Sequence, residues 1–488
     1  MSRGLSKSIQ IGIVGIWLCL VGILVYRHYI SGETISSLQA VQESQFTEKE
    51  EWFGIYVQNT KIGHVRTATE KIGDEYRFTQ QGETEAPGEG GTTKSTTLFT
   101  CLTDRSFRMK SFSFETRTGE TFYRSRGEID EDGVLLVFIE NNQQKKTETV
   151  DMSASPYLPI TIKSMLYSQG LEKGKRFRVP VFDIFSGKTE EMTAEVQDLL
   201  PVKAGINVMT VYVLKTGGTL SWINDRGYTM KETNPAGFQY IVEPENLAVS
   251  TESKPIVDLF SLPVLKADRL LRDTETLSLL RVKLTGSDEK DYPLLNEGRQ
   301  HFEGGVLEIR KEREEDLEGR TYDLPYSGNN LASYRGAGPY VESDHRTIKY
   351  NANKFVAIEK NAFRLARFLT SNLYLTIRKM PMLHLLTSMD VFGISAGDSN
   401  EHTILFTAFA RAAGLPTRMV GGLVYLKGHF YYHTWPEVWL DEWVPIDPTM
   451  GQFPADVTHI RFLEGHMEEL ASFTQNMGAM NIEILEAL

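Results

Sequence analysis

Residues 397–413 read GDSNEHTILFTAFARAA, and the chain continues with Gly414-Leu415-Pro416. Apolar residues recur in this stretch at the spacing of one helix face, and Gly-Leu-Pro is typical of a helix end. The apolar positions are Ile404, Leu405, Ala408, Phe409 and Ala412. The pattern predicts a helix from Asn400 to Ala413, which places the hydroxyl of Ser399 at the N-terminus of that helix.

Two shorter stretches downstream supply an imidazole and a carboxylate. His433 opens the sequence HTWPEVWL, where aromatic and β-branched residues predict a strand. Asp447 lies in WVPIDPT, directly after apolar residues that predict another strand. A hydroxyl, an imidazole and a carboxylate are the groups of a nucleophilic triad. Ser399, His433 and Asp447 supply one group of each kind.

The three stretches together resemble the transglutaminase-like superfamily. Its bacterial members read Gly-Asp-Cys-x-Glu-His, Arg-Ala-Ala-Gly-x-Pro-x-Arg, His-x-Trp-x-Glu and Asp-Pro-Thr, in this order. The chain matches these elements between residues 397 and 449, except that Ser399 stands where the family has its cysteine. The resemblance implies an α+β, papain-like cysteine-hydrolase domain, with His433 as the general base and Asp447 as the residue that orients its ring.

The serine changes the chemistry that is expected. A helix N-terminus favours an anion by about 0.3–1 kcal/mol, and one pKa unit corresponds to about 1.4 kcal/mol. With an imidazolium nearby, this ionises a thiol whose pKa begins near 8.5, but not a hydroxyl. A serine can still attack if His433 removes its proton during the reaction. Because a misplacement of about 1 Å costs roughly a hundredfold in rate, we expect weak activity or none.

The resemblance implies amide acyl transfer or peptide hydrolysis through an acyl-enzyme. Two readings of Ser399 stay open. In the first, the chain is a transglutaminase-like enzyme of the cell envelope whose thiol is replaced, naturally or by design. In the second, it is a non-catalytic envelope module that binds a peptide or protein in the groove beside Ser399.

Other residues near His433 are weaker candidates for a catalytic or metal-binding role. His429 and His433 share one face of the predicted strand, but no further ligands stand at metal spacing. We therefore expect no metal site, and the sequence indicates no cofactor. We expect a salt bridge or a backbone hydrogen bond from Glu437, a core position for Trp435 and a structural role for His402.

The N-terminal residues predict a membrane anchor. Residues 9–26 contain no charged side chain and are just long enough to cross a bilayer as a helix. Arg3 and Lys7 precede them, which predicts a cytoplasmic N-terminus. No small-x-small cleavage site closes the apolar stretch, so an uncleaved anchor is favoured over a signal peptide. We expect a single-pass protein of the inner membrane whose bulk is periplasmic and meets extracytoplasmic peptides or proteins.

Charge and cysteine content exclude two classes of protein. The net charge is −12 and the pI is near 5.5, and no basic stripe is present, so we expect no nucleic-acid partner. Cys19 lies in the apolar N-terminal segment and Cys101 is alone in the rest of the chain. The sequence therefore offers no intrachain disulfide framework.

The chain divides into five predicted regions. They are a membrane anchor at 1–30, a polar tether at 31–50, one or two antiparallel β-rich domains at 51–245, a mixed connecting region at 246–345 and the transglutaminase-like domain at 346–488. Alternating residues and glycine turns predict the strands of the third region. Further expected elements are helices at 159–170, 262–272 and 351–378, strands at 277–284 and 305–310, and a C-terminal helix with an edge strand at 481–485.

Overall fold

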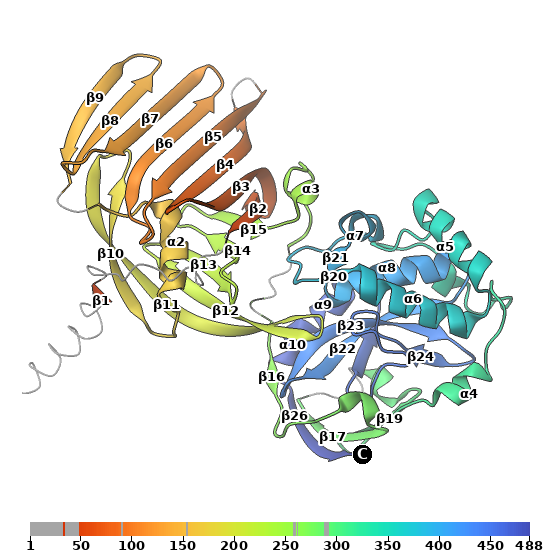
Figure 1. The fold of residues 1–488 in the computed structure, drawn as a ribbon. Helices are drawn as coiled ribbons and strands as arrows, with labels where there is room; N and C mark the ends of the chain where they lie inside the picture. Colours follow the sequence, from red (N-terminus) through yellow and green to blue (C-terminus); the bar gives the residue numbers. More distant parts are fainter. Residues whose placement is uncertain are drawn as a thin grey trace, which may run out of the picture. The chain divides into compact units, whose positions relative to one another are not determined.

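The computed structural model describes residues 33–34, 48–88, 91–152, 155–256, 260, 262–286 and 292–488. Its contacts form two compact units (Figure 1). Of these described residues, one unit comprises those up to Leu200 together with Thr210–Thr251, and the other comprises Pro201–Met209 together with those from Glu252 to Leu488. The predicted anchor and nearly all of the predicted tether lie outside the described residues. Within the described residues, no helix is both long enough and apolar enough to cross a membrane.

The first unit is built on a large antiparallel sheet, as its alternating sequence predicts. Its strands are β1 (Glu33–Thr34), β2 (Lys49–Val57), β3 (Thr60–Ile72), β4 (Glu75–Gly88), β5 (Gly91–Thr103), β6 (Met109–Thr118), β7 (Thr121–Ile129), β8 (Val134–Asn141), β9 (Lys145–Asp151), β10 (Arg176–Asp183), β11 (Lys188–Ala204), β12 (Asn207–Thr216), β13 (Thr219–Asn224), β14 (Thr229–Thr233) and β15 (Phe238–Val242). Strands β2 to β9 follow one another across the sheet, and β10 to β15 lead back to β2. Only the short β1 is parallel to its neighbour, β10.

Helix α2 (Pro159–Ser168) packs against this sheet. Its bounds agree closely with the helix predicted at 159–170. Pro159 occupies the first turn, where its missing N–H costs no hydrogen bond. The apolar face of α2, with Ile162, Met165 and Leu166, is buried against side chains of β4 to β6, β8 and β10 to β13. Side chains from both ends of the sheet therefore contribute to one hydrophobic core with α2. Figure 1 shows this helix beside the strands of the sheet. The short helix α3 (Glu245–Ala248) follows β15.

The second unit contains two mainly antiparallel sheets. The first has the order β16-β23-β22-β25 with β24 paired to β23, and the second has the order β18-β19-β17-β26. The strands are β16 (Leu265–Lys266), β17 (Leu279–Thr285), β18 (Gln300–Glu303), β19 (Val306–Arg310), β22 (Thr417–Leu426), β23 (His429–Trp439), β24 (Trp443–Pro445), β25 (Ile460–Glu464) and β26 (Asn481–Ala487). Side chains of both sheets share one core. The predicted strands at 277–284, 305–310 and 481–485 are confirmed by β17, β19 and β26.

Helices cover the first of these sheets, and the central one is α8 (Ser399–Ala412). The other elements are α4 (Glu314–Glu318), α5 (Arg346–Ile358), α6 (Ala362–Thr376), α7 (Ser388–Ile394), α9 (Met467–Ser472), α10 (Thr474–Met477), the 3-10 helices η4 (Thr274–Thr276), η5 (Pro293–Asn296) and η6 (Ala332–Arg335), and the parallel pair β20 (Arg378–Lys379) and β21 (Ala396–Gly397). Helix α8 contacts α5, α6 and α7 on one side and β22 and β23 on the other. Its N-terminal turn is therefore held in the interior.

Two sequence-based predictions in this unit are wrong. The single helix expected at 351–378 is interrupted, because Asn361 accepts a hydrogen bond from the N–H of Arg364 and caps a new helix, α6. The helix expected at 262–272 is also absent. Residues Leu265–Lys266 instead form β16, whose backbone pairs with Phe430 and His429 of β23. In both cases the spacing of apolar residues predicted a helix. The hydrogen bonds that end the helix or pair the strand cannot be inferred from that spacing.

Candidate active site

The start of α8 places Ser399 in the first helical turn. Asp398 precedes it as the N-cap residue, and the side chain of Glu401 accepts a 2.8 Å hydrogen bond from the Asp398 N–H. A Cβ at Gly397 would lie 2.2 Å from the Cβ of Glu401, so only glycine allows this close turn. Ser399 is 4% exposed. Its backbone N–H belongs to the first turn of the helix, whose N–H groups have no intrahelical acceptor.

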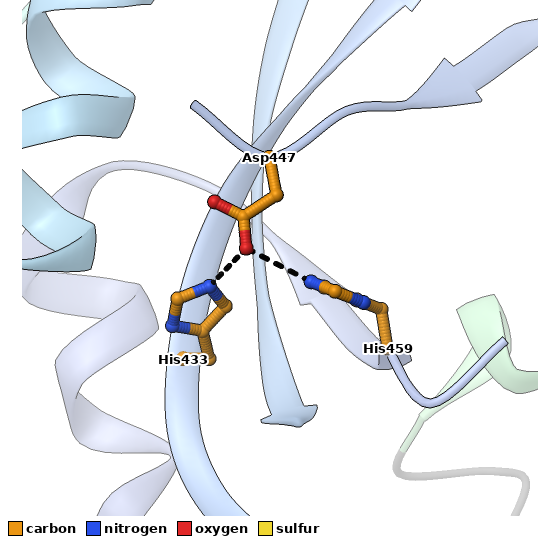
Figure 2. A group of neighbouring side chains, drawn as sticks. All are labelled: His433, Asp447 and His459. Atoms are coloured by element: carbon orange, nitrogen blue, oxygen red, sulfur yellow. Dashed lines mark hydrogen bonds and ion pairs between the residues drawn. The ribbon is translucent and has the colours of Figure 1, made fainter. Parts of the chain in front are cut away.

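His433 and Asp447 are joined by a hydrogen bond. The Nε2 atom of His433, on β23, lies 2.7 Å from Oδ2 of Asp447 (Figure 2). Oδ1 of Asp447 accepts hydrogen bonds from the backbone N–H groups of Thr449 and Met450 at 2.7 and 3.1 Å. The carboxylate accepts, so Nε2 carries the proton and Nδ1 of His433 keeps its lone pair. That buried Nδ1 has no hydrogen-bond partner among the described residues.

A further hydrogen bond connects the two elements that carry Ser399 and His433. Oγ1 of Thr434 donates to Oδ1 of Asn400 at 2.9 Å, and α8 packs against β23. Asn400 and Thr434 are the residues that directly follow Ser399 and His433 in the sequence. The structure therefore brings all three predicted residues into one region, although they are separated by up to 48 positions in the numbering (447 − 399).

The electrostatic surroundings favour a neutral His433. Burial lowers the pKa of His433, and the positive charges of Lys203 and His459 lower it further, whereas Asp447 raises it in part. Burial would raise the pKa of Asp447, but its contacts with His433 and His459 hold it well below the usual range. At neutral pH the pair is therefore a neutral imidazole with an ionised carboxylate, which is the resting form of a general base.

Lys203 and Asp398 form a buried ion pair that the sequence did not indicate. Nζ of Lys203 lies 2.9 Å from Oδ2 of Asp398, and the backbone N–H of Gly205 donates to Oδ1 at 2.7 Å. Lys203 is the penultimate residue of β11, and Gly205 begins the turn to β12; both lie in the segment that belongs to the second unit. The turn is thereby fixed to the residue that precedes Ser399.

A pocket opens beside Ser399. Besides Ser399 and its neighbours in α8, its walls include Pro201, Val202, Leu262, Val264, Met382 and the rings of Tyr431 and Tyr432. Most of these side chains are apolar, and the one lysine in the wall, Lys203, is already paired with Asp398. The pocket therefore suits an apolar group next to the Ser399 hydroxyl.

His459 is a further member of the site that sequence reasoning missed. Its Nε2 lies 3.0 Å from Oδ2 of Asp447, the same oxygen that binds His433 (Figure 2). Ring nitrogens of His433 and His459 and a carboxylate oxygen of Asp447 lie within 4.8 Å of one another, which is the spacing of a metal site. Both nitrogens that face Asp447 donate to its carboxylate, so neither has a lone pair for a metal ion. In the structure the two rings instead bond to the carboxylate, and these hydrogen bonds satisfy the buried charge. His429, which precedes His433 on β23, is not in this group, and its ring packs near Tyr431.

The remaining polar residues near His433 behave as the sequence analysis expected. Both oxygens of Glu437 bind arginines, with Arg461 Nη1 at 2.7 and 2.9 Å and Arg418 Nε at 2.8 Å. The ring of Trp435 is fully buried and stacks on His433 at a centroid distance of 6.1 Å. Nδ1 of His402 lies 2.8 Å from the backbone oxygen of Asp398, which stabilises the first turn of α8.

Comparisons with known proteins agree with the C-terminal assignment. Residues 352–448, which contain all three predicted residues, match the family described as the transglutaminase-like superfamily. The search of curated proteins gives no match. The chain thus carries a transglutaminase-like domain together with a large antiparallel β-rich region.

Three solved structures are similar at low identity. A beta-barrel-like protein of a domain of unknown function from Brucella abortus is 10% identical, with a TM-score of 0.31, over 40% of this chain and 94% of the other. A protein from Cytophaga hutchinsonii, proposed to be a cysteine protease, is 12% identical, with a TM-score of 0.26, over 46% and 82% of the two chains. A protein of the DUF1089 family from Pseudomonas aeruginosa is 11% identical, with a TM-score of 0.21, over 36% of this chain and 90% of the other.

Proposed function

We propose that the transglutaminase-like domain catalyses acyl transfer from an amide or an activated ester, with Ser399 as the nucleophile, His433 as the general base and Asp447 as the residue that orients the ring. One observation carries the proposal. Nε2 of His433 is bonded to Asp447 while its buried Nδ1 is without a partner. An imidazole held in this tautomer can accept a proton from a nucleophile.

The proposed reaction has two halves. In the first, Oγ of Ser399 bonds to the carbonyl carbon as its proton passes to Nδ1 of His433. The bond from that carbon to the leaving nitrogen or oxygen then breaks, and His433 returns the proton to the leaving group. In the second, water or an amine attacks the acyl-serine with the same help, which restores Ser399. The first N–H groups of α8 stabilise the oxyanion.

The serine makes this a slow enzyme. The hydroxyl does not ionise before attack, so each turnover depends on proton removal by His433 during the step.

The low exposure of Ser399, at 4%, and the full burial of His433 favour one alternative function. In that alternative, the pocket binds a peptide or protein without turnover.

We also propose where the protein works. The apolar segment at residues 9–26 holds the chain in the inner membrane, and the bulk of the chain lies outside the cytoplasm, where it meets peptides or proteins of the envelope. Protease protection in inverted and right-side-out vesicles tests the orientation. Digestion of the second unit in inverted vesicles alone would contradict it.

A serine-directed probe tests the proposed nucleophile. We expect a fluorophosphonate to modify the wild-type chain at Ser399, found by mass spectrometry, and to leave Ser399→Ala unmodified. We expect Ser399→Cys to react with iodoacetamide and to cleave an aryl ester about a hundredfold faster than wild type, because the neutral His433 removes the proton of a thiol more easily than that of a hydroxyl. If all three forms are folded and none of them reacts, the result favours the non-catalytic binding module.

The pocket predicts a preference for apolar acyl groups. We expect Val202→Asp to reduce the hydrolysis of an aryl butyrate by about 10- to 100-fold, because a carboxylate replaces an apolar wall beside the acyl chain. An aryl ester of 4-aminobutyrate is expected to lose less, because the introduced carboxylate attracts its ammonium group. The matched control is Val249→Asp, at a valine that is 47% exposed. Equal losses for both esters in Val202→Asp would contradict the assignment of this pocket to the acyl group.

A further inference from the structure

Both ring nitrogens of His459 face carboxylates. Nε2 lies 3.0 Å from Oδ2 of Asp447, and Nδ1 lies 3.1 Å from Oδ1 of Asp456. An ionised carboxylate only accepts hydrogen bonds, so each nitrogen that contacts one must carry a proton. An imidazole with protons on both nitrogens is a cation.

Both carboxylates are held in their ionised form. Asp456 accepts hydrogen bonds at Oδ1 from the N–H and hydroxyl of Thr458 and at Oδ2 from Gln452. Burial would raise the pKa of Asp456, but its contacts with His459 and Thr458 hold it far below the usual range. Burial alone would lower the pKa of His459, and its bonds to the two aspartates raise it to about 9.

The surrounding structure fixes the position of His459. Arg299, directly before β18, donates to the backbone oxygens of Ala455, Asp456 and His459 at 2.7, 2.9 and 3.3 Å, which ties the segment before β25 to the start of β18. The His459 ring is fully buried and meets the Trp435 ring edge-on at 5.2 Å. The ring therefore has little freedom to leave either aspartate.

We propose that His459 is a permanently protonated positioning residue, which holds Asp447 in place and keeps His433 neutral and able to accept a proton. His459 shares Oδ2 of Asp447 with His433, so part of the negative charge that would favour an imidazolium at position 433 is compensated. The other charged groups that act on this cluster are Lys203, on His433, and Lys379, on Asp447.

This arrangement suits a hydroxyl nucleophile. A thiol enzyme gains from an imidazolium that stabilises its thiolate, whereas a serine needs a base that is neutral before attack. Two cations, Lys203 and His459, disfavour the imidazolium of His433. The role in catalysis rests on the proposed function, but the protonation of His459 does not.

The protonation state can be measured without any substrate. In the full-length chain with ¹⁵N-labelled histidine, we expect both His459 nitrogens to give protonated resonances between about pH 6 and pH 8, assigned by their loss in His459→Gln. In Asp456→Asn, which keeps the ring but removes one carboxylate, we expect His459 to lose a proton within that range. A deprotonated His459 nitrogen in the wild-type chain at about pH 7 would overturn the proposal.

The catalytic consequence is a shift of the pH profile. His433 must be neutral to act, so labelling of Ser399 falls as the pH drops through the pKa of His433. Removing the cation in His459→Gln raises that pKa, and we expect the acid limb to move up by about one pH unit or more. The control His429→Gln, on the same strand as His433, is expected to leave the acid limb in place. An unmoved limb in His459→Gln overturns the proposal. A wild-type chain that never labels refutes the proposed function, and the spectra still decide the charge of His459.

Discussion

Changing His433 to glutamine is expected to slow the modification of Ser399 by a fluorophosphonate by on the order of 10⁴-fold. The amide of glutamine can still donate a hydrogen bond to Asp447, so the substitution replaces the 2.7 Å bond by which His433 holds β23 to Asp447, two residues beyond β24. It removes the basic nitrogen, because nothing then stands at the position of Nδ1 to accept the Ser399 proton. The measurement is the second-order labelling rate at about pH 7.5, where His433 is neutral.

The matched control for this prediction is His429→Gln. It makes the same chemical change four residues earlier on β23, at a ring that packs near Tyr431 and not in the carboxylate cluster. We expect its labelling rate to stay within about twofold of wild type. If His433→Gln also labels within about tenfold of wild type, Ser399 reacts without a base and the proposed mechanism is wrong.

The elements that carry the candidate site were predictable because local chemistry specifies them. The expected helix from Asn400 to Ala413 is α8 (Ser399–Ala412), and its end at Gly414 has a positive φ of 83°, where a Cβ would meet Pro325 at 2.4 Å. His433 lies on β23, as its aromatic and β-branched neighbours indicate. Periodicity and turn residues are properties of a few neighbouring positions, so one sequence is enough to read them.

The partners of the site were not predictable, because they come from distant parts of the chain. Lys203 is 195 positions from Asp398. The residues around Lys203 form no basic pattern that distinguishes it from an ordinary solvent-exposed lysine. His459 follows Asp456 by three positions, and nothing local reveals that Asp447 lies on its other side. The same limit applies to the β-rich region, because the pairing of β15 with β2, which joins its described strands into one sheet, connects residues that are far apart in the sequence.

Glu437 shows how charge stabilises the sheet behind the site. It is fully buried between Arg418 and Arg461, which themselves are almost completely buried. Arg418 also pairs with Glu297 and Glu464, whose side chains are more exposed. Burial would raise the pKa of Glu437, but the two arginines hold it below the usual value. Its stabilising contribution is therefore present at neutral pH and is lost as the pH falls through that lowered pKa.

Replacing Glu437 with glutamine is expected to lower the free energy of unfolding of the second unit by about 3–5 kcal/mol, because two buried guanidinium groups lose the carboxylate between them. Urea unfolding followed by tryptophan fluorescence measures this, since Trp435, Trp439 and Trp443 lie on β23 and β24. Glu464→Gln removes a carboxylate that is 35% exposed from the same Arg418, and we expect a loss of no more than about 1 kcal/mol. If the two variants lose equal stability, the pair at Glu437 is no stronger than a surface contact, and the sheet that carries His433 owes its rigidity to apolar packing alone.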